Sequence, residues 1–116
     1  MAMEIKEFKL NDGTFLRYKK IGKGDPILLL HTFRNRLEYS DKLGELLKKE
    51  FTVFSIDLPG FGDSPINTKT VYDLNFFTSS IVNFIKSQKV DNLAIAGESI
   101  GATLAASVST QLPKTV

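Results

Sequence analysis

The 116-residue sequence lacks cysteine, long apolar runs and an excess of either charge. Without cysteine, disulfide bonds and cysteine-based metal sites are excluded. No apolar run is longer than the four residues of Ile27 to Leu30, and the N-terminus has no apolar core typical of a signal peptide. The 15 lysines and arginines are spread along the chain against 13 aspartates and glutamates, for a net charge of +2. We therefore expect no nucleic-acid partner, no membrane association and a cytoplasmic location.

The composition is that of one globular domain, with 42% hydrophobic and 24% charged residues. An Asn-Asp-Gly turn at 11–13 predicts a hairpin between strands at 4–10 and 14–18. Apolar patterns and turn residues predict buried strands at 27–30, 52–56 and 92–96, and helices at 38–49, 71–87 and 100–112. This order predicts an α/β fold in which an N-terminal hairpin precedes parallel strand–helix units.

Apolar residues recur at helical spacing in each predicted helix and predict the buried faces. These residues are Tyr39, Leu43, Leu46 and Leu47 in the first helix, Leu74, Phe77, Ile81, Phe84 and Ile85 in the second, and Leu104, Val108 and Leu112 in the third. After the third helix, residues 114–116 have the character of the start of another strand. We therefore expect residues 1–116 to form a single partial domain that is truncated before the next strand.

The glycine pattern does not favour a nucleotide cofactor. Gly22 and Gly24 precede a predicted strand, whereas a dinucleotide-binding loop follows one. No phosphate-binding P-loop motif occurs anywhere in the chain. We expect neither a cofactor nor a metal ion.

The segment Gly97-Glu98-Ser99-Ile100-Gly101 matches the G-x-S-x-G pattern of a nucleophile elbow. A predicted strand precedes it and a predicted helix follows, so the chain must turn sharply at Ser99. That turn forces Ser99 into a strained backbone conformation, and side chains two residues away on either side would clash. Gly97 and Gly101 remove those side chains. The pattern thus predicts a serine hydroxyl at the carboxyl edge of the sheet; the alternative is an ordinary strand–helix turn of another parallel-sheet protein.

Together with two further segments, the elbow makes the sequence resemble the α/β-hydrolase fold family over essentially the whole chain. Residues 28–31 resemble the strand that ends in the family's oxyanion-motif histidine, here His31. Residues 55–64, SIDLPGFGDS, resemble the distinctive loop that follows the next strand. The resemblance identifies the chain as the N-terminal portion of such a fold, from the branch with a serine nucleophile.

This resemblance implies a serine hydrolase in which Ser99 attacks the carbonyl of a small ester-like substrate and forms an acyl-enzyme. It also implies that the backbone N–H groups of Phe33 and Ile100 stabilise the oxyanion. Gly97, Gly101 and His31 would support this arrangement. Esterases, acyl transferases, peptidases and carbon–carbon bond hydrolases all remain open.

Two residues after His31 depart from the family pattern. Thr32 stands where glycine is usual, and Arg34 replaces a common proline. Because a β-branched threonine resists positive φ, the oxyanion loop is expected to follow a different path. Arg34 and Arg36 either recognise a carboxylate on the substrate or are solvated loop residues, and the second interpretation is favoured.

The triad partners of Ser99 are missing from the sequence. The family's acid and histidine follow the nucleophile, but no Asp, Glu or His follows Ser99. His31 is expected to order its loop rather than act as a base, and Asp57 and Asp63 are expected to stabilise turns. We therefore expect the chain alone to be inactive as a triad hydrolase. Two hypotheses stay open: a hydrolase completed by self-association or by a missing C-terminal chain, and a non-catalytic binding or interaction module.

Overall fold

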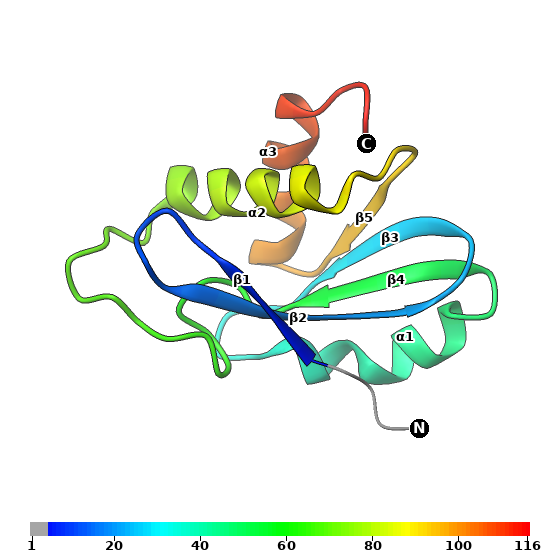
Figure 1. Ribbon diagram of the computed structural model, residues 1–116, viewed down its shortest axis with the longest axis horizontal. Helices are drawn as coiled ribbons and strands as arrows, with labels where there is room; N and C mark the ends of the chain where they lie inside the picture. Colours follow the sequence, from blue (N-terminus) through cyan, green and yellow to red (C-terminus); the bar gives the residue numbers. More distant parts are fainter. Residues whose placement is uncertain (1–4) are drawn as a thin grey trace.

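In the computed structural model, which describes residues 5–116, five strands form one mixed sheet in the order β1-β2-β4-β3-β5 (Figure 1). The strands are β1 (Ile5–Lys9), β2 (Phe15–Gly22), β3 (Asp25–Leu30), β4 (Phe51–Ile56) and β5 (Ala94–Gly97). β3 pairs in parallel with both β4 and β5, whereas β2 pairs antiparallel with β1 and β4. The predicted α/β class with an N-terminal hairpin is confirmed; Glu4, in the first predicted strand, lies outside the described residues.

The hairpin turn forms as Asp12 and Gly13 predict. The Asp12 carboxylate accepts hydrogen bonds from the backbone N–H and the hydroxyl of Thr14. The second strand, however, is longer than predicted and continues to Gly22, because its second half pairs with β4 from Tyr18↔Ile56 to Gly22↔Thr52. Only residues 23 and 24 remain for the turn into β3.

Helices cover both faces of the sheet (Figure 1). The short helix η1 (Leu37–Ser40) and α1 (Asp41–Leu47) lie on one face, and α2 (Leu74–Gln88) and α3 (Ile100–Gln111) pack together on the other. α2 begins three residues later than predicted, since Asp73 caps it by accepting a hydrogen bond from the Phe76 N–H.

The apolar stripe predicted for the first helix is not its buried face. Tyr39, Leu43 and Leu46 are 52%, 46% and 77% exposed. Leu37 of η1 and Gly44 of α1 are buried instead, and an added Cβ at Gly44 would lie 3.6 Å from the Ile21 side chain. The buried residue of α1 is thus one without a side chain, so this side of the helix carries little apolar area and no periodic signal.

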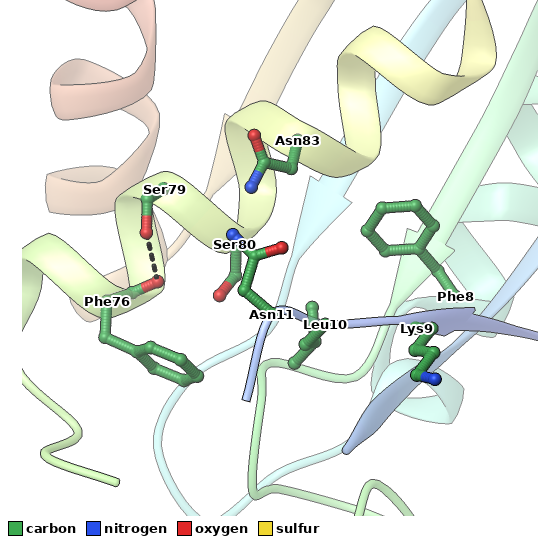
Figure 2. A pocket seen from close by; sticks show the side chains of 8 residues that line it. All are labelled: Phe8, Lys9, Leu10, Asn11, Phe76, Ser79, Ser80 and Asn83. Atoms are coloured by element: carbon green, nitrogen blue, oxygen red, sulfur yellow. Dashed lines mark hydrogen bonds between the residues drawn. The ribbon is translucent and has the colours of Figure 1, made fainter. Parts of the chain in front are cut away.

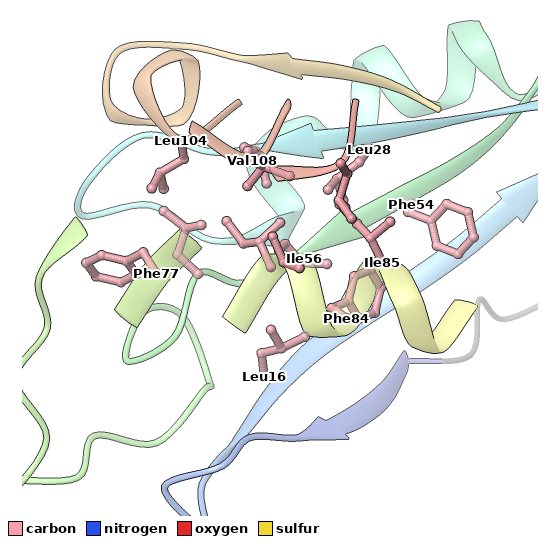
Figure 3. Packing of buried hydrophobic residues seen from close by; sticks show 14 of the residues in the cluster. Leu16, Leu28, Phe54, Ile56, Phe77, Phe84, Ile85, Leu104 and Val108 are labelled. Carbon is pink, nitrogen blue, oxygen red and sulfur yellow. The ribbon is translucent and has the colours of Figure 1, made fainter. Parts of the chain in front are cut away.

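The main core lies between the sheet and the pair α2–α3 (Figure 3). Leu104, Val108 and Leu112 are buried there as predicted, and so are four of the five residues predicted for α2, with Leu74 half exposed. Figure 3 labels the residues at the centre of this cluster: Leu16, Leu28, Phe54, Ile56, Phe77, Phe84, Ile85, Leu104 and Val108.

The strand that leads into the elbow differs from its prediction. β5 is the edge of the sheet and its residues are partly exposed, so it is not a strand buried on both faces. Residues 113–115 form a turn rather than the beginning of a strand. The Thr115 carbonyl accepts a hydrogen bond from the Leu93 N–H at 2.7 Å, which folds this segment back onto the start of β5.

Candidate active site

Ser99 occupies a strained turn at the carboxyl end of β5. Its φ and ψ are 58° and −118°, a conformation that side chains other than glycine rarely adopt. An added Cβ at Gly97 would lie 2.3 Å from the Gly101 backbone, and one at Gly101 would lie 2.7 Å from the Leu30 carbonyl oxygen. Both distances are too short for any side chain, so the two glycines permit the turn as the sequence predicts.

The Ser99 hydroxyl is exposed and does not cap the helix that follows it. The Ser99 backbone carbonyl accepts hydrogen bonds from the N–H groups of Ala102 and Thr103. The Ile100 N–H, by contrast, has no backbone partner within residues 5–116. A serine hydroxyl and a free N–H donor thus stand together at the N-terminus of α3, where the helix dipole favours negative charge.

The loop after β3 lies beside this turn. β3 is the only described neighbour of β5, and Leu30 pairs with Gly97. The Phe33 N–H, three residues past Leu30, has no backbone partner within the described part of the chain. Thr32 does not need positive φ; that conformation falls on Arg34, with φ 62°.

His31 is 1% exposed and both of its ring nitrogens are engaged. Nδ1 lies 2.6 Å from the Thr32 carbonyl oxygen, and Nε2 accepts a hydrogen bond of 2.8 Å from the Leu58 N–H. This network assigns the neutral tautomer with the proton on Nδ1. Burial lowers the pKa of His31 below its ordinary value, which also favours the neutral ring. His31 ties the loop after β3 to the loop after β4 and has no nitrogen free for Ser99.

Asp57 is fully buried and organises the loop after β4. Its carboxylate accepts hydrogen bonds from the Leu37 N–H at 2.8 Å, the Asp63 N–H at 3.0 Å and the Arg17 Nε at 2.8 Å. The hydrogen bond to Asp57, together with Glu38, raises the pKa of Arg17. The carboxylate therefore stabilises its own loop and ties it to η1 and β2, in agreement with the turn role expected from the sequence.

Arg17 and Tyr39 are the residues that sequence reasoning missed. Arg17 forms ion pairs with Asp57, Glu38 and Asp63. In the sequence, however, it cannot be told apart from an ordinary exposed cation in an alternating strand. The Tyr39 hydroxyl donates a hydrogen bond of 2.9 Å to the Glu98 carboxylate beside the elbow, and this bond raises the pKa of Tyr39. Neither contact leaves a local pattern, because each joins segments at least 21 residues apart.

An apolar cavity of about 310 Å³ opens beside the loop after β3. The Phe33 ring, 52% exposed, stacks on Phe61 with a centroid distance of 5.4 Å. The cavity is lined by Phe33, Pro59, Gly60, Phe61, Ile66, Tyr72 and Phe77. No charged side chain lines it, so it suits an apolar group of a ligand. Arg34 and Arg36 do not line it either; Arg36 pairs with the exposed Asp63 at 3.5 Å.

Within residues 5–116, no group of three or more His, Asp or Glu side chains could hold a metal ion. No helix in this part of the chain is long and apolar enough to cross a membrane. The site offers one hydroxyl, two free backbone donors and an apolar cavity.

A family model described as "alpha/beta hydrolase fold" matches residues 25–116. Among curated relatives, the chain is 28% identical over 103 residues to a pimeloyl-[acyl-carrier protein] methyl ester esterase of Pseudoalteromonas atlantica, covering 89% of this chain and 38% of that protein. It is 26% identical over 114 residues to an (E)-2-((N-methylformamido)methylene)succinate hydrolase of Acinetobacter baylyi, covering 98% of this chain and 43% of that one. The chain thus spans about two-fifths of the length of these relatives.

Solved structures also share the fold of this chain over nearly its whole length. A bacterial membrane phospholipase A superimposes with a TM-score of 0.90 at 26% identity, over 98% of this chain and 37% of that one. A thioesterase domain from the curacin biosynthetic pathway superimposes with a TM-score of 0.90 at 24% identity, over 100% of this chain and 44% of that one. The similarity therefore covers nearly all of this chain and less than half of either structure.

Proposed function

Because this chain belongs to the alpha/beta hydrolase fold family, we propose that it is the nucleophile-bearing part of a serine hydrolase that cleaves esters or related carbonyl compounds. The observation that carries the proposal is Ser99 itself, exposed and held at positive φ between Gly97 and Gly101. Backbone strain of about 1–3 kcal/mol at one residue is retained where the surrounding structure enforces it, often at active sites.

In the proposed reaction, Ser99 Oγ bonds to the substrate carbonyl carbon and loses its proton to a base. The carbonyl oxygen becomes an oxyanion that the Ile100 and Phe33 N–H groups receive. Collapse of this tetrahedral intermediate breaks the bond to the leaving alcohol, which takes up the proton from the base. An acyl group remains on Ser99. Water then attacks this ester and releases the acid, returning the hydroxyl.

We expect the base to come from outside this sequence; this is supported by the one histidine, His31, whose two ring nitrogens are both engaged. The open edge of β5 leads us to expect that self-association or a C-terminal chain provides the missing groups. The apolar cavity beside Phe33 favours a substrate with an alkyl or aromatic group next to the carbonyl. We also propose that the protein is cytoplasmic.

Acylation of the protein tests this proposal without requiring turnover. The chain is incubated with p-nitrophenyl butyrate, with and without added imidazole as an external base, and the adduct is located by intact and peptide mass. We expect one butyryl group on Ser99, formed faster with imidazole because the base is what the chain lacks. Ser99→Ala should abolish this adduct, while Ser109→Ala in the same helix should not. Equal labelling of wild type and Ser99→Ala would refute the proposal.

The engaged His31 favours one second candidate, a non-catalytic module that retains the front part of the fold. This candidate predicts no Ser99 adduct under any of these conditions. Because the open edge of β5 favours self-association under either candidate, the Ser99 adduct is the result that separates them.

A further inference from the structure

A groove of about 320 Å³ lies between the β1–β2 hairpin and α2 (Figure 2). The hairpin contributes Phe8, Lys9, Leu10 and Asn11, and the helix contributes Phe76, Ser79, Ser80 and Asn83. In Figure 2, Asn11, Ser80 and Asn83 gather in the middle of the groove, with Phe76 on the left and Phe8 on the right. The groove therefore has a polar centre and two aromatic ends.

The three central side chains have unused hydrogen-bonding capacity. Within the described residues, the hydroxyl of Ser80 and the side-chain amides of Asn11 and Asn83 make no hydrogen bond to protein, whereas neighbouring Ser79 donates to the Phe76 carbonyl. Ser80 is only 5% exposed, yet no fully enclosed side-chain oxygen in this part of the chain lacks a partner. Its hydroxyl must therefore open into the groove.

Contacts outside the groove hold its walls in place. Phe8 packs edge-on against Phe84 with centroids 5.6 Å apart, and Phe76 packs edge-on against Tyr72 at 5.3 Å. The hairpin turn is fixed by a 2.7 Å hydrogen bond from the Thr70 hydroxyl to Asp12. The aromatic walls are therefore preformed, whereas the exposed side chains of Asn11 and Asn83 would be ordered when a ligand binds.

The lining selects the chemistry of a ligand. Lys9 is the one charged residue among the eight, so nothing there would neutralise a cation. Each carboxamide offers both a donor and an acceptor, and the hydroxyl does the same. Their best complement is a group that also donates and accepts, such as a secondary amide, with apolar groups on either side to meet the aromatic ends.

We propose that this groove is a second ligand site, which binds small uncharged molecules carrying a secondary amide between two apolar groups. Asn11, Ser80 and Asn83 hydrogen-bond the amide, and Phe8 and Phe76 contact its substituents. β1 and β5 are opposite edges of the sheet, so this site is separate from Ser99. It does not depend on the function proposed for Ser99.

Two matched ligands test the site by NMR of the ¹⁵N-labelled full chain. N-Benzylbutanamide and benzyl butanoate have the same shape and differ at the amide N–H. The titrations use Ser99→Ala, so that neither ligand can react at the elbow. We expect saturable shifts of the Asn11 and Asn83 side-chain NH₂ signals with the amide, and about fivefold weaker binding of the ester through loss of one hydrogen bond.

Variants on α2 separate this site from non-specific binding. Ser80→Ala and Asn83→Ala should each weaken amide binding about fivefold. Asn75→Ala, an exposed asparagine on the same helix outside the groove, should leave it unchanged. The proposal is overturned if the shifts do not saturate, if amide and ester bind equally, or if Asn75→Ala weakens binding as much as Asn83→Ala.

Discussion

Alanine at Gly101 should destabilise the protein, although alanine in a helix is normally favourable. Gly101 lies in the first turn of α3, and glycine-to-alanine changes within helices usually stabilise by about 0.5–1 kcal/mol. Here the added Cβ would lie 2.7 Å from the Leu30 carbonyl oxygen and 3.2 Å from that of His31. A carbon and an oxygen at 2.7 Å repel each other, so part of the structure must move.

The magnitude follows from what can move. Leu30 ends β3, which is paired on both sides, with Ile56 of β4 and Gly97 of β5. Its carbonyl therefore cannot withdraw without disturbing two ladders, and the strain falls in the usual range for overpacking, about 1–3 kcal/mol. After the helix-propensity gain is subtracted, the net loss should be about 1–2 kcal/mol, with a fall in Tm of about 5–10 °C.

Gly44→Ala supplies the matched control. Its added Cβ would lie 3.6 Å from Ile21 Cδ1 and 3.7 Å from Val53 Cγ1, which are ordinary contact distances. This variant should gain about 0.5–1 kcal/mol from helix propensity and added apolar contact. Urea unfolding followed by circular dichroism measures both variants against wild type. The steric reasoning is refuted if Gly101→Ala is as stable as wild type, or if the two variants shift in the same direction.

Three further predictions concern the residues around the elbow. Ser99→Gly should raise the free energy of unfolding by about 1 kcal/mol, since the relief of backbone strain exceeds the cost of the greater chain entropy of the unfolded state. A urea midpoint below that of wild type would contradict this. Asp57→Asn should lower the free energy of unfolding by about 3 kcal/mol, because Arg17 then keeps only its ion pairs with Glu38 and Asp63. As a control, Asp91→Asn on the surface should change the free energy of unfolding by less than about 0.5 kcal/mol. The pKa of His31 is lower folded than unfolded, so its contribution is fully present above the unfolded pKa near 6.5 and is lost as the pH falls below it. The free energy of unfolding of wild type, measured by urea titration, should therefore fall between about pH 7 and 5 by at most about 1.4 kcal/mol per pH unit. His31→Gln should remove that slope, and an unchanged slope would show that His31 is not the titrating group.

The fold could be predicted well where one segment determines its own structure. The Asp12–Gly13 turn defined the hairpin, and the spacing of Leu104 and Val108 defined the buried face of α3. The prediction failed for α1, whose apparent stripe is exposed. The buried residue of this helix is Gly44, which has no side chain and therefore leaves no apolar signal in the sequence.

The residues of the candidate site show the same division. Gly97, Ser99 and Gly101 lie within five residues, and a sharp strand–helix turn allows few alternatives, so the local pattern was sufficient to predict the strained backbone turn at Ser99. The roles of His31 and Asp57 depend on partners far along the chain, Leu58 for the imidazole and Arg17 for the carboxylate.

By itself, the sequence determined that Ser99 turns between two glycines and that residues 100–116 contain no Asp, Glu or His. Only the tertiary structure decided that His31 is also unavailable, that β5 forms an open edge, and that a second groove lies between the hairpin and α2. The physical reason is range: backbone sterics act over a few neighbouring residues and can be recognised in a short motif. Hydrogen-bond partners, sheet edges and cavities arise only when distant segments meet.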